Sequence, residues 1–532
     1  MRTVLFAAAA AALIFNGCES PAGRDVLVIG LGTEPGVLLP VAEASALDGE
    51  INAQLYLKLN SARWVNGALD YLVDELSLAE RWTYSRDSTV LTYHLREEAV
   101  WSDGEPIDAE DVRFTFQLVR RPEIGSVYAD SWEHLDSVAV VDDHTVAFHF
   151  RRRYPGMLFH TGIGIIPQHI YEEYTVGQAS LTSHPSLLEP GPELVVSGPY
   201  SIGRWVRGER LLLVENPRAF TTRPATDTVV LRLIPDETTR LLEFENGELD
   251  VTTPLEVSQA QEIEEDPRFR IETMDDRFYD YIAWNGSEYP PFADPHVRRA
   301  LSLAIDRRGI IDGQGLDRFA RPAAGPYPPI FAEVSDPSLE PDPYLPDSAR
   351  AVLAAQGWRD SDGDGLLDRE GTPFSFTLLT QAGNERRNSA AQIIQAAYRE
   401  IGIDMRIRPV EFNALLGLMF EGRDFEAVLM GWQVALAPNY LAGFFWPPGH
   451  PYNITGYASA ELDRLIPEAL AAPNASAAAP YWREAARTIA AGRPYAFLWY
   501  YDDIVAVNEK VRNTRMDTYG LLQNLHEWTV HN

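Results

Sequence analysis

The chain has 532 residues, of which 45% are hydrophobic and 11% aromatic, so it can bury cores of more than one domain. Its 45 Lys and Arg residues stand against 77 Asp and Glu residues, a formal net charge of -32 at pH 7. A polyanion of this kind repels phosphate backbones, which excludes nucleic acid as an expected partner. We expect about two to four domains with a soluble, self-repelling surface.

The N-terminus predicts export from the cytoplasm. A short positive start, Met1-Arg2, precedes an apolar stretch from Val4 to Phe15. The stretch has about twelve residues, fewer than the roughly twenty that a membrane-spanning helix needs. Its length fits the hydrophobic region of a secretory signal peptide. We therefore predict a signal peptide over residues 1–17 and a mature protein in the periplasm or at the cell surface.

The first half of the mature chain predicts strands around one well-marked helix. The apolar run Val26 to Ile29 is typical of a buried strand. Alternating patterns at 90–95 and 145–150 predict two further strands. Between them, Asp108 is placed to cap a helix, with Asp111 at its third position.

The second half predicts an alternation of helices and strands. Asp294 can cap a helix whose first residue is Pro295, a position that needs no amide donor. Strands are expected at 375–380, 404–409 and 427–431, and helices at 390–401 and 412–421. The stretch 469–480 predicts a helix end followed by a loop. This alternation indicates an α/β lobe with a covered sheet.

The stretch TYHLREEAVWSDGEPIDAEDVRFTF (92–116) carries a resemblance to a known family. Its carboxylates are placed to cap the start of the helix and stabilise its dipole, and no residue in the stretch needs a catalytic role to explain its presence. The order of its residues resembles the signature of the family 5 extracellular solute-binding proteins, the oligopeptide-, dipeptide- and nickel-binding components of ABC importers. The matching residues are Leu95-Arg96, Trp101-Ser102-Asp103-Gly104, Pro106 and Ala109-Glu110-Asp111-Val112.

Further stretches resemble landmarks of the same family, in the same order. They are IIPQHIY (165–171), SGPYSIGRWVRGERLLLVENPRAF (197–220), RLLEFENGELDV (240–251), YIAWN (281–285), DPHVRRALSLAIDR (294–307), GWRDSDGDGLLD (357–368) and NITGYASAELDRLIPEA (453–469). Together they cover about residues 25–510, and several matches in register are far more specific than a single one.

The resemblance implies an α/β, two-lobed periplasmic-binding-protein fold with mixed sheets, an extra small lobe and a ligand cleft between the lobes. Lobe I would comprise residues 24–60, 190–280 and 500–532. The small lobe would be inserted at 61–189, and lobe III would span 281–499. Two hinge strands would pass near 281–285 and 496–503. Ligand would be enclosed as the lobes close.

The function that the resemblance implies is capture of a peptide-like or other small solute and its delivery to an ABC permease in the membrane, without catalysis. We expect a monomer that needs no cofactor. Two alternatives stay open: a secreted hydrolase acting on peptides or glycans, and a binding protein that senses a ligand without transport. The chain has no Gly-x-Ser-x-Gly, His-Glu-x-x-His or Walker motif, although a pair of glycosidase carboxylates is spatial and invisible in sequence.

The segment LMGWQVALAPNYLAGFFW (429–446) bears on the ligand. In peptide-binding members of the family, an Asp after the Gly-Trp pair holds the ligand's α-ammonium. Here Trp432 is followed by no acidic residue until Glu461, which puts a peptide anchored in that way in doubt. We predict Trp432 and Tyr440 as ligand contacts in this segment. Trp284 and Asn285, beside the expected hinge, are predicted as ligand contacts as well.

The acidic stretch DSDGDGLLD (360–368) has two interpretations. Its aspartates match positions 1, 3, 5 and 9 of a calcium-binding loop: Asp360, Asp362, Asp364 and Asp368. Position 12, which normally supplies a bidentate Glu, is Gly371. A solvated tight turn is therefore favoured over a structural calcium site.

Cys18 is the only cysteine and cannot form an internal disulfide. A free buried thiol, a reactive or metal-binding thiol and a processing site are the remaining roles. In an exported binding protein, its place behind Gly17 and the apolar stretch predicts the lipidation site of a bacterial lipoprotein, although Phe15 and Asn16 depart from the usual pattern. A lipid on Cys18 would tether the protein to the membrane.

Overall fold

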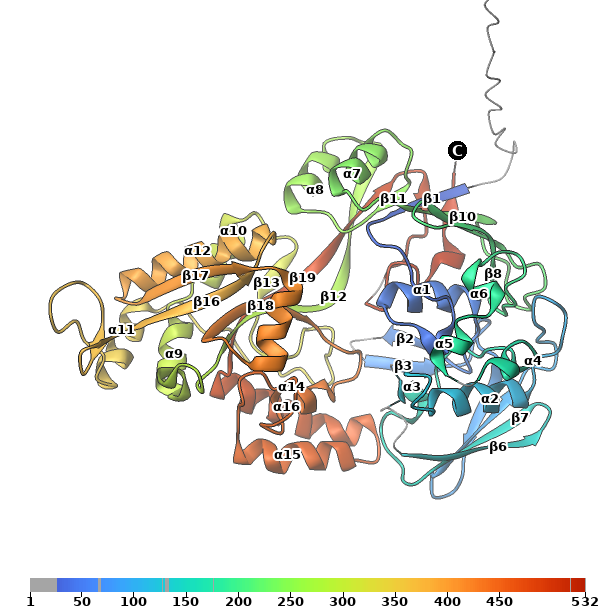
Figure 1. The fold of residues 1–532 in the computed structure, drawn as a ribbon, viewed down its shortest axis with the longest axis horizontal. Coiled ribbons are helices and arrows are strands. Elements are labelled where there is room, and N and C mark those ends of the chain that lie inside the picture. Colours follow the sequence, from blue (N-terminus) through green and yellow to red (C-terminus); the bar gives the residue numbers. More distant parts are fainter. Residues whose placement is uncertain are drawn as a thin grey trace, which may run out of the picture.

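The computed structural model describes residues 26–531 except 66–67, 127, 130–133, 176 and 517 (Figure 1). The predicted signal peptide and Cys18 lie outside the described residues. Among the helices of the described part, none is both long and apolar enough to cross a membrane.

A mixed sheet of eleven strands runs through both halves of the molecule. Its order is β17-β16-β18-β12-β19-β11-β1-β10-β9-β8, and β13 also pairs with β19. The strands are β1 (Val26–Leu31), β8 (Tyr200–Val206), β9 (Arg210–Glu215), β10 (Thr228–Leu233), β11 (Val251–Thr252), β12 (Phe269–Trp284), β13 (Ala320–Pro322), β16 (Ser375–Gln381), β17 (Asp404–Val410), β18 (Ala427–Gln433) and β19 (Tyr495–Asn508).

The two longest strands, β12 and β19, pair antiparallel at the centre of this sheet. In Figure 1 they run between a left half that holds β16, β17 and β18 and a right half that holds β1, β8 and β10. The register of the pair shifts between Met274 and Phe278. Both stretches expected near a hinge, 281–285 and 496–503, overlap these two strands.

Smaller sheets complete the β structure. A four-stranded antiparallel sheet has the order β4 (Ala79–Tyr84), β5 (Val90–Leu95), β7 (Thr145–Phe150) and β6 (Leu135–Asp142). Three ribbons are β2 (Ser61–Val65) with β3 (Ala68–Leu72), β14 (Asp368–Arg369) with β15 (Thr372–Pro373), and β20 (Val511–Arg512) with β21 (Thr529–Val530).

The α-helices lie mainly around these sheets (Figure 1). They are α1 (Ala46–Leu55), α2 (Ala109–Val119), α3 (Met157–His160), α4 (Gln168–Tyr171), α5 (Gln178–Leu181), α6 (Pro185–Leu188), α7 (Glu237–Glu245), α8 (Val257–Glu264), α9 (Pro295–Leu303), α10 (Arg307–Gly313), α11 (Pro346–Ala355), α12 (Glu385–Glu400), α13 (Phe412–Leu416), α14 (Tyr440–Phe445), α15 (Ala460–Ala471) and α16 (Ala475–Gly492).

Three hydrophobic clusters form the core of the described residues. One fills the half built from the N-terminal strands, the four-stranded sheet and the C-terminal segment. The other two cover opposite faces of the sheet in the other half, and β12 sends Tyr281 to one face and Trp284 to the other. Because both faces are buried, β18 and β19 are largely apolar, and so is the end of β12 over residues 281–284.

Most predicted elements are confirmed. The strand at 26–29 is found as β1, the alternating patterns as β5 and β7, and the Asp108 and Asp294 caps as the starts of α2 and α9. Asp108 and Asp111 form a reciprocal capping box. The helix expected at 412–421 is present as α13 followed by a π-helical turn, Gly417–Gly422.

Two predicted boundaries are wrong, and in both cases an asparagine caps the helix at an earlier residue. The helix expected from residue 390 begins at Glu385, because the side chain of Asn384 accepts the amide of Arg387. The loop expected up to residue 480 is helix α16 from Ala475 onward, capped by Asn474. Asparagine is among the preferred N-cap residues, and the alanines that follow Asn474 are the best helix formers.

Candidate functional site

A cavity of about 510 Å³ lies beside α1, a size typical of small-molecule sites. Its wall comes mainly from residues 40–62 and 159–164. Arg277 on β12 and Leu436 after β18 contribute from the side of the other half, and Tyr519 and Gln523 contribute from the C-terminal segment. The cavity is therefore assembled from segments that are far apart in sequence.

The start of α1 is fixed by a capping box that shapes this wall. Ser45 Oγ accepts the amide of Asp48 at 3.1 Å, and the Asp48 carboxylate accepts the amides of Ser45 and Gly36 at 3.1 and 2.7 Å. The box satisfies donors that the first helical turn leaves unpaired. It also fixes Glu43 before the helix and Asn52 within it, both of which line the cavity.

Lys58 lies just beyond the end of α1, and its backbone is held on two sides. Its carbonyl accepts the amide of Leu78 at 2.7 Å, and single β-bridges connect it to Ser77 and Gly164. The side chain lines the cavity. Burial lowers the pKa of the Lys58 ammonium, and the negative charge of Glu43 opposes this effect.

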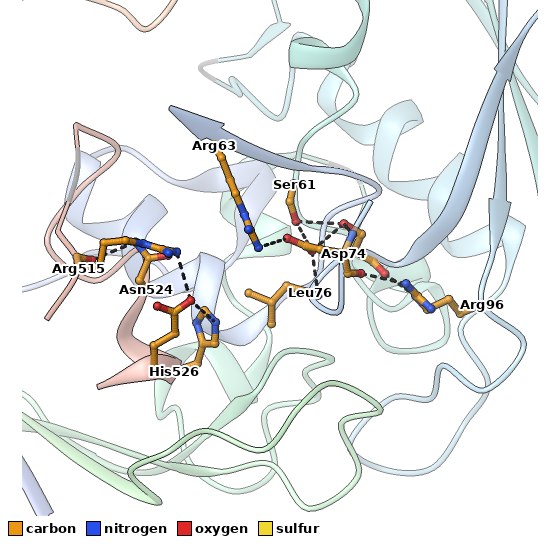
Figure 2. A network of polar contacts seen from close by, with 10 residues as sticks. Ser61, Arg63, Asp74, Leu76, Arg96, Arg515, Asn524 and His526 are labelled. Carbon is orange, nitrogen blue, oxygen red and sulfur yellow. Dashed lines mark hydrogen bonds and ion pairs between the residues drawn. The ribbon is translucent and has the colours of Figure 1, made fainter. Parts of the chain in front are cut away.

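A hydrogen-bond network around Asp74 braces the segment that follows Lys58 (Figure 2). The Asp74 carboxylate accepts Ser61 Oγ at 2.7 Å and Arg63 Nη2 at 2.9 Å. Arg96 donates to the backbone carbonyls of Asp74 and Ser77 at 2.9 and 3.0 Å. The turn that runs alongside Lys58 is thereby tied to the end of β5.

Glu43 is the acidic counterpart of Lys58 in the cavity wall. Its carboxylate accepts Asn52 Nδ2 at 3.0 Å and the hydroxyl of Tyr128. Burial raises the pKa of Glu43, while the hydrogen bonds from Tyr128 and Asn52 and the charge of Lys58 lower it. Burial also raises the pKa of the Tyr128 hydroxyl, with Glu43 adding to the effect.

Two further cationic or titratable side chains line the cavity. Arg277 donates through Nη1 to the carbonyl of Val434 at 2.7 Å and through Nε to the carbonyl of Thr518 at 3.1 Å. His160 Nδ1 lies 2.8 Å from the Tyr154 hydroxyl. Burial, aided by the charge of His134, lowers the pKa of His160 to about 4.

Trp284 and Asn285, predicted as ligand contacts, have packing and backbone partners and are not among the residues that line this cavity. Trp284 is 1% exposed and packs against Phe292 and Phe376. Asn285 is buried and donates through Nδ2 to the carbonyl of Arg423 at 2.9 Å.

Trp432 and Tyr440 lie together on the other face of the sheet, within one aromatic cluster. Trp432 stacks on Phe444 with ring centroids 4.5 Å apart, and Tyr440 contacts the same ring at 5.5 Å. The hydroxyl of Tyr440 donates to the carbonyl of Pro326. Of the segment 429–446, Leu436 lines the cavity, and ligand contact by Trp432 and Tyr440 stays a prediction.

The acidic stretch 360–368 is an exposed turn before β14. Carboxylate oxygens of Asp360, Asp362 and Asp364 lie within 4.8 Å of one another. Asp368 points to Ser361 instead, whose amide and hydroxyl it accepts at 2.9 and 2.6 Å. Asp360 likewise accepts the amide of Gly363 at 2.7 Å. Such carboxylate-to-amide bonds stabilise a turn by themselves, and both interpretations of this stretch stay open.

Sequence reasoning does not single out Glu43, Lys58 or Arg277, because the cavity forms only when distant segments meet. One usable signal is present. Of the 45 Lys and Arg residues only two are lysines, Lys58 and Lys510. Because lysine and arginine differ in charge distribution and hydrogen-bond geometry, the two lysines can be picked out from the sequence as unusual cations.

Comparison with known families identifies the chain. Residues 75–454 match the family model of the bacterial extracellular solute-binding proteins, family 5. The chain belongs to this family. It is thus a solute-binding protein of the ABC transporter type and not an enzyme, which removes the hydrolase alternative. The oligopeptide-binding protein AppA of Bacillus subtilis is similar, with 27% identity over 95% of this chain and 91% of AppA.

Solved structures agree with this solute-binding fold. AppA of B. subtilis in complex with a nonapeptide superposes with a TM-score of 0.75 at 27% identity, covering 96% of this chain and all of that one. CtaP of Listeria monocytogenes gives a TM-score of 0.82 at 22% identity, covering 96% and 100%. NikZ of Campylobacter jejuni with Ni(L-His) gives 0.78 at 22%, covering 95% and 99%. The expected α/β periplasmic-binding-protein fold is confirmed.

Proposed function

We propose that this solute-binding protein captures a peptide or similar small solute in the cavity beside α1 and delivers it to an ABC permease. The observation that carries the proposal is the composition of the cavity wall. It joins α1 and Lys58 from one half of the molecule to Leu436 from the other, with Arg277 on the shared strand β12 between them. A ligand there would contact both halves at once and favour their approach.

The proposed movement is a closure of lobes about β12 and β19. Lobe I would comprise 24–60, 190–280 and 500–532, the inserted lobe 61–189, and lobe III 281–499. The placement of β12 and β19 supports this division, since they are the strands that connect the two halves of the main sheet.

The ligand would not be held by an acidic residue after Trp432, because the sequence has none before Glu461. Related proteins hold ligands as different as a nonapeptide and a nickel–histidine complex. The fold therefore leaves the ligand open, and the side chains of this cavity must select it.

Recovery of the natural solute tests the proposal. The protein is purified from its native host without unfolding, then denatured, and released small molecules are identified by mass spectrometry. We expect one solute or solute class near equimolar amount, and readdition to the emptied protein should raise its melting temperature and reduce its radius of gyration. A protein that carries no solute, and whose melting temperature no peptide or solute pool changes, contradicts the proposal.

We also propose that Cys18 carries a lipid that tethers the mature protein to the membrane. The single cysteine directly behind Gly17 and an apolar stretch supports this role. Labelled palmitate should enter the wild-type protein and be absent from Cys18→Ser. Incorporation that persists in Cys18→Ser contradicts lipidation at this residue.

A further inference from the structure

The two lysines of the chain have different surroundings. Lys510 Nζ lies 2.6 Å from the buried carboxylate of Asp250, so its charge is neutralised within the protein. Lys58 lines the cavity, and among the described residues its ammonium has no hydrogen bond and no carboxylate within 4.0 Å. The negative charge of Glu43 attracts the Lys58 ammonium over a longer distance and partly offsets the cost of its burial.

The other charged side chains of the cavity have partners within the protein. Glu43 accepts from Asn52 and Tyr128, and Glu50 accepts the amide of Leu522 at 2.9 Å. Arg277 donates to two backbone carbonyls, and His160 contacts the Tyr154 hydroxyl. Among the charged side chains that line the cavity in the described part of the chain, Lys58 is the one cation whose N–H donors have no acceptor.

The Lys58 side chain is half-buried, and an ammonium partly removed from water without a close partner is unfavourable unless something else supplies the opposite charge. The lowered pKa of Lys58 has the same origin, since burial penalises its charged form. The backbone of Lys58 is fixed by its bridges to Ser77 and Gly164, and its flexible side chain can direct the charge into the cavity. The ammonium is a compact point charge, which suits a single acceptor group.

We propose that Lys58 anchors a carboxylate of the bound solute. The inference rests on the proposed function, because it assigns the chemistry of the ligand in that same cavity. A carboxylate fits better than a phosphate dianion, since Glu43 and Glu50 line the same cavity and would repel a second negative charge. The net charge of -32 repels an anionic ligand, and a cation in the cavity wall offsets this repulsion locally.

The test compares variants of the full chain. Lys58→Met removes the cation and keeps the aliphatic stem, Lys58→Arg restores the charge, and Lys510→Arg is the control for the other lysine. The probes are a tripeptide pool with free C-terminal carboxylates, the same pool as C-terminal amides, and inorganic phosphate. Melting temperature and calorimetric affinity are measured for each protein, together with the solute released on denaturation.

We expect the free-acid pool, and a carboxylate-bearing natural solute, to bind wild type and Lys510→Arg at least tenfold more tightly than Lys58→Met. Lys58→Arg should recover part of the affinity. Without ligand, Lys58→Met should melt close to wild type, because the half-buried ammonium makes no hydrogen bond or close ion pair and only the longer-range attraction of Glu43 is lost. A lower melting temperature of the empty variant would instead indicate a structural lysine and overturn the proposal.

The two proposals fail in distinguishable ways. If wild type binds amidated and free-acid pools equally and Lys58→Met does the same, the cavity binds solute and the Lys58 anchor is wrong. A released solute without a carboxylate, or a specific response to inorganic phosphate, also overturns the anchor. If no pool binds to wild type and no solute is released, the proposed function fails as well.

Discussion

The carboxylate of Asp280 on the central strand β12 is completely buried, with 0% of its surface exposed. It accepts Arg386 Nη1 at 2.7 Å, Arg387 Nε at 2.9 Å and Trp499 Nε1 at 2.8 Å. Asp280 lies on β12 and Trp499 on β19, so one carboxylate connects the two central strands with the first turn of α12. A buried charge of this kind is tolerated only because its partners satisfy it.

Asp280→Asn should lower the free energy of unfolding by about 3–5 kcal/mol, because it leaves two arginines without their counter-charge. Urea unfolding followed by tryptophan fluorescence measures the change. Asp312→Asn is the matched control, since its pair with Arg308 is exposed and should contribute under about 0.5 kcal/mol. Equal effects of the two variants would show that Asp280 is not a structural centre.

His160 should make the protein less stable in acid. Its pKa is about 4 in the folded protein and 6.5 in the unfolded chain, so the unfolded chain binds more protons between these values. Stability is therefore lost as pH falls from about 6.5 to 4, by about 3 kcal/mol. His160→Gln should flatten this part of the curve in urea titrations at several pH values. An unchanged slope would contradict the assignment.

Asp111 should make the protein less stable as the pH rises, the opposite of the effect of His160. Burial raises its pKa to about 6 from 3.8, although the amides of Gln168 and Asp108 and the Trp101 indole donate to its carboxylate. The folded protein binds more protons between pH 3.8 and 6, so stability falls as pH rises through this range, by about 3 kcal/mol. Asp111→Asn should remove that slope in the same titration, and a steeper decline would contradict the prediction.

At the scale of elements, the family landmark SGPY (197–200) has a direct structural explanation. Ser197 Oγ accepts the amide of Leu57 at 2.9 Å, and the amide of Gly198 donates to the carbonyl of Leu55 at 2.8 Å. These two residues therefore complete the C-terminal end of α1, directly before Lys58. A Cβ on Gly198 would lie well inside van der Waals contact with the backbone of Gln54.

Gly198→Ala should destabilise the protein by about 1–3 kcal/mol, because the backbone at the end of α1 cannot move aside without breaking hydrogen bonds. Differential scanning calorimetry measures the loss. Gly208→Ala is a useful control for added bulk, since no atom lies within 4 Å of the position that its new methyl group would take, although its positive φ of 74° adds strain. A fully stable Gly198→Ala would contradict this close approach.

Helices and strands with local signals could be predicted from the sequence. The capping aspartates and Pro295 mark the starts of α2 and α9, and period-two alternation locates β5 and β7. The asparagine caps of α12 and α16 give a weaker signal, because their helices begin with polar or alanine-rich turns that lack an apolar stripe. Local signals thus predict elements whose first turn is already amphipathic.

At the scale of the molecule, the fold could be predicted through ordered family landmarks, whereas the cavity could not. Aromatic residues are dense around Trp284 in the sequence, which favours a cleft, yet Trp284 packs between Phe292 and Phe376. A strand buried on both faces is as aromatic as a binding site. Lys58 has no motif around it, and it shares a cavity wall with Glu43 and Arg277 only in the folded chain.

Direct contacts between residues outside the cavity lining also join the two halves of the molecule. Trp64 on β2 meets Phe331 edge-on, with ring centroids 5.5 Å apart and planes at 88°. Arg152, after β7, donates to the carbonyl of Leu470 on α15 at 3.1 Å. Neither pair is close in sequence, so separation of the halves would break both contacts while leaving each half intact.

Trp64→Ala and Arg152→Ala should therefore weaken solute binding about threefold to tenfold each, since an aromatic pair or a charged hydrogen bond contributes about 1 kcal/mol to the joined form. Calorimetry with the solute released from wild type measures affinity, and small-angle scattering should show a larger radius of gyration. Trp205→Ala is the matched control, because Trp205 stacks with Arg207 within one half and should leave both quantities unchanged. If Trp64→Ala lowers only the unfolding free energy, the contact is packing and does not hold the halves together. The comparison separates these outcomes because the affinity for solute depends on the fraction of molecules whose two halves are in contact. The free energy of unfolding instead depends on the stability of the whole fold.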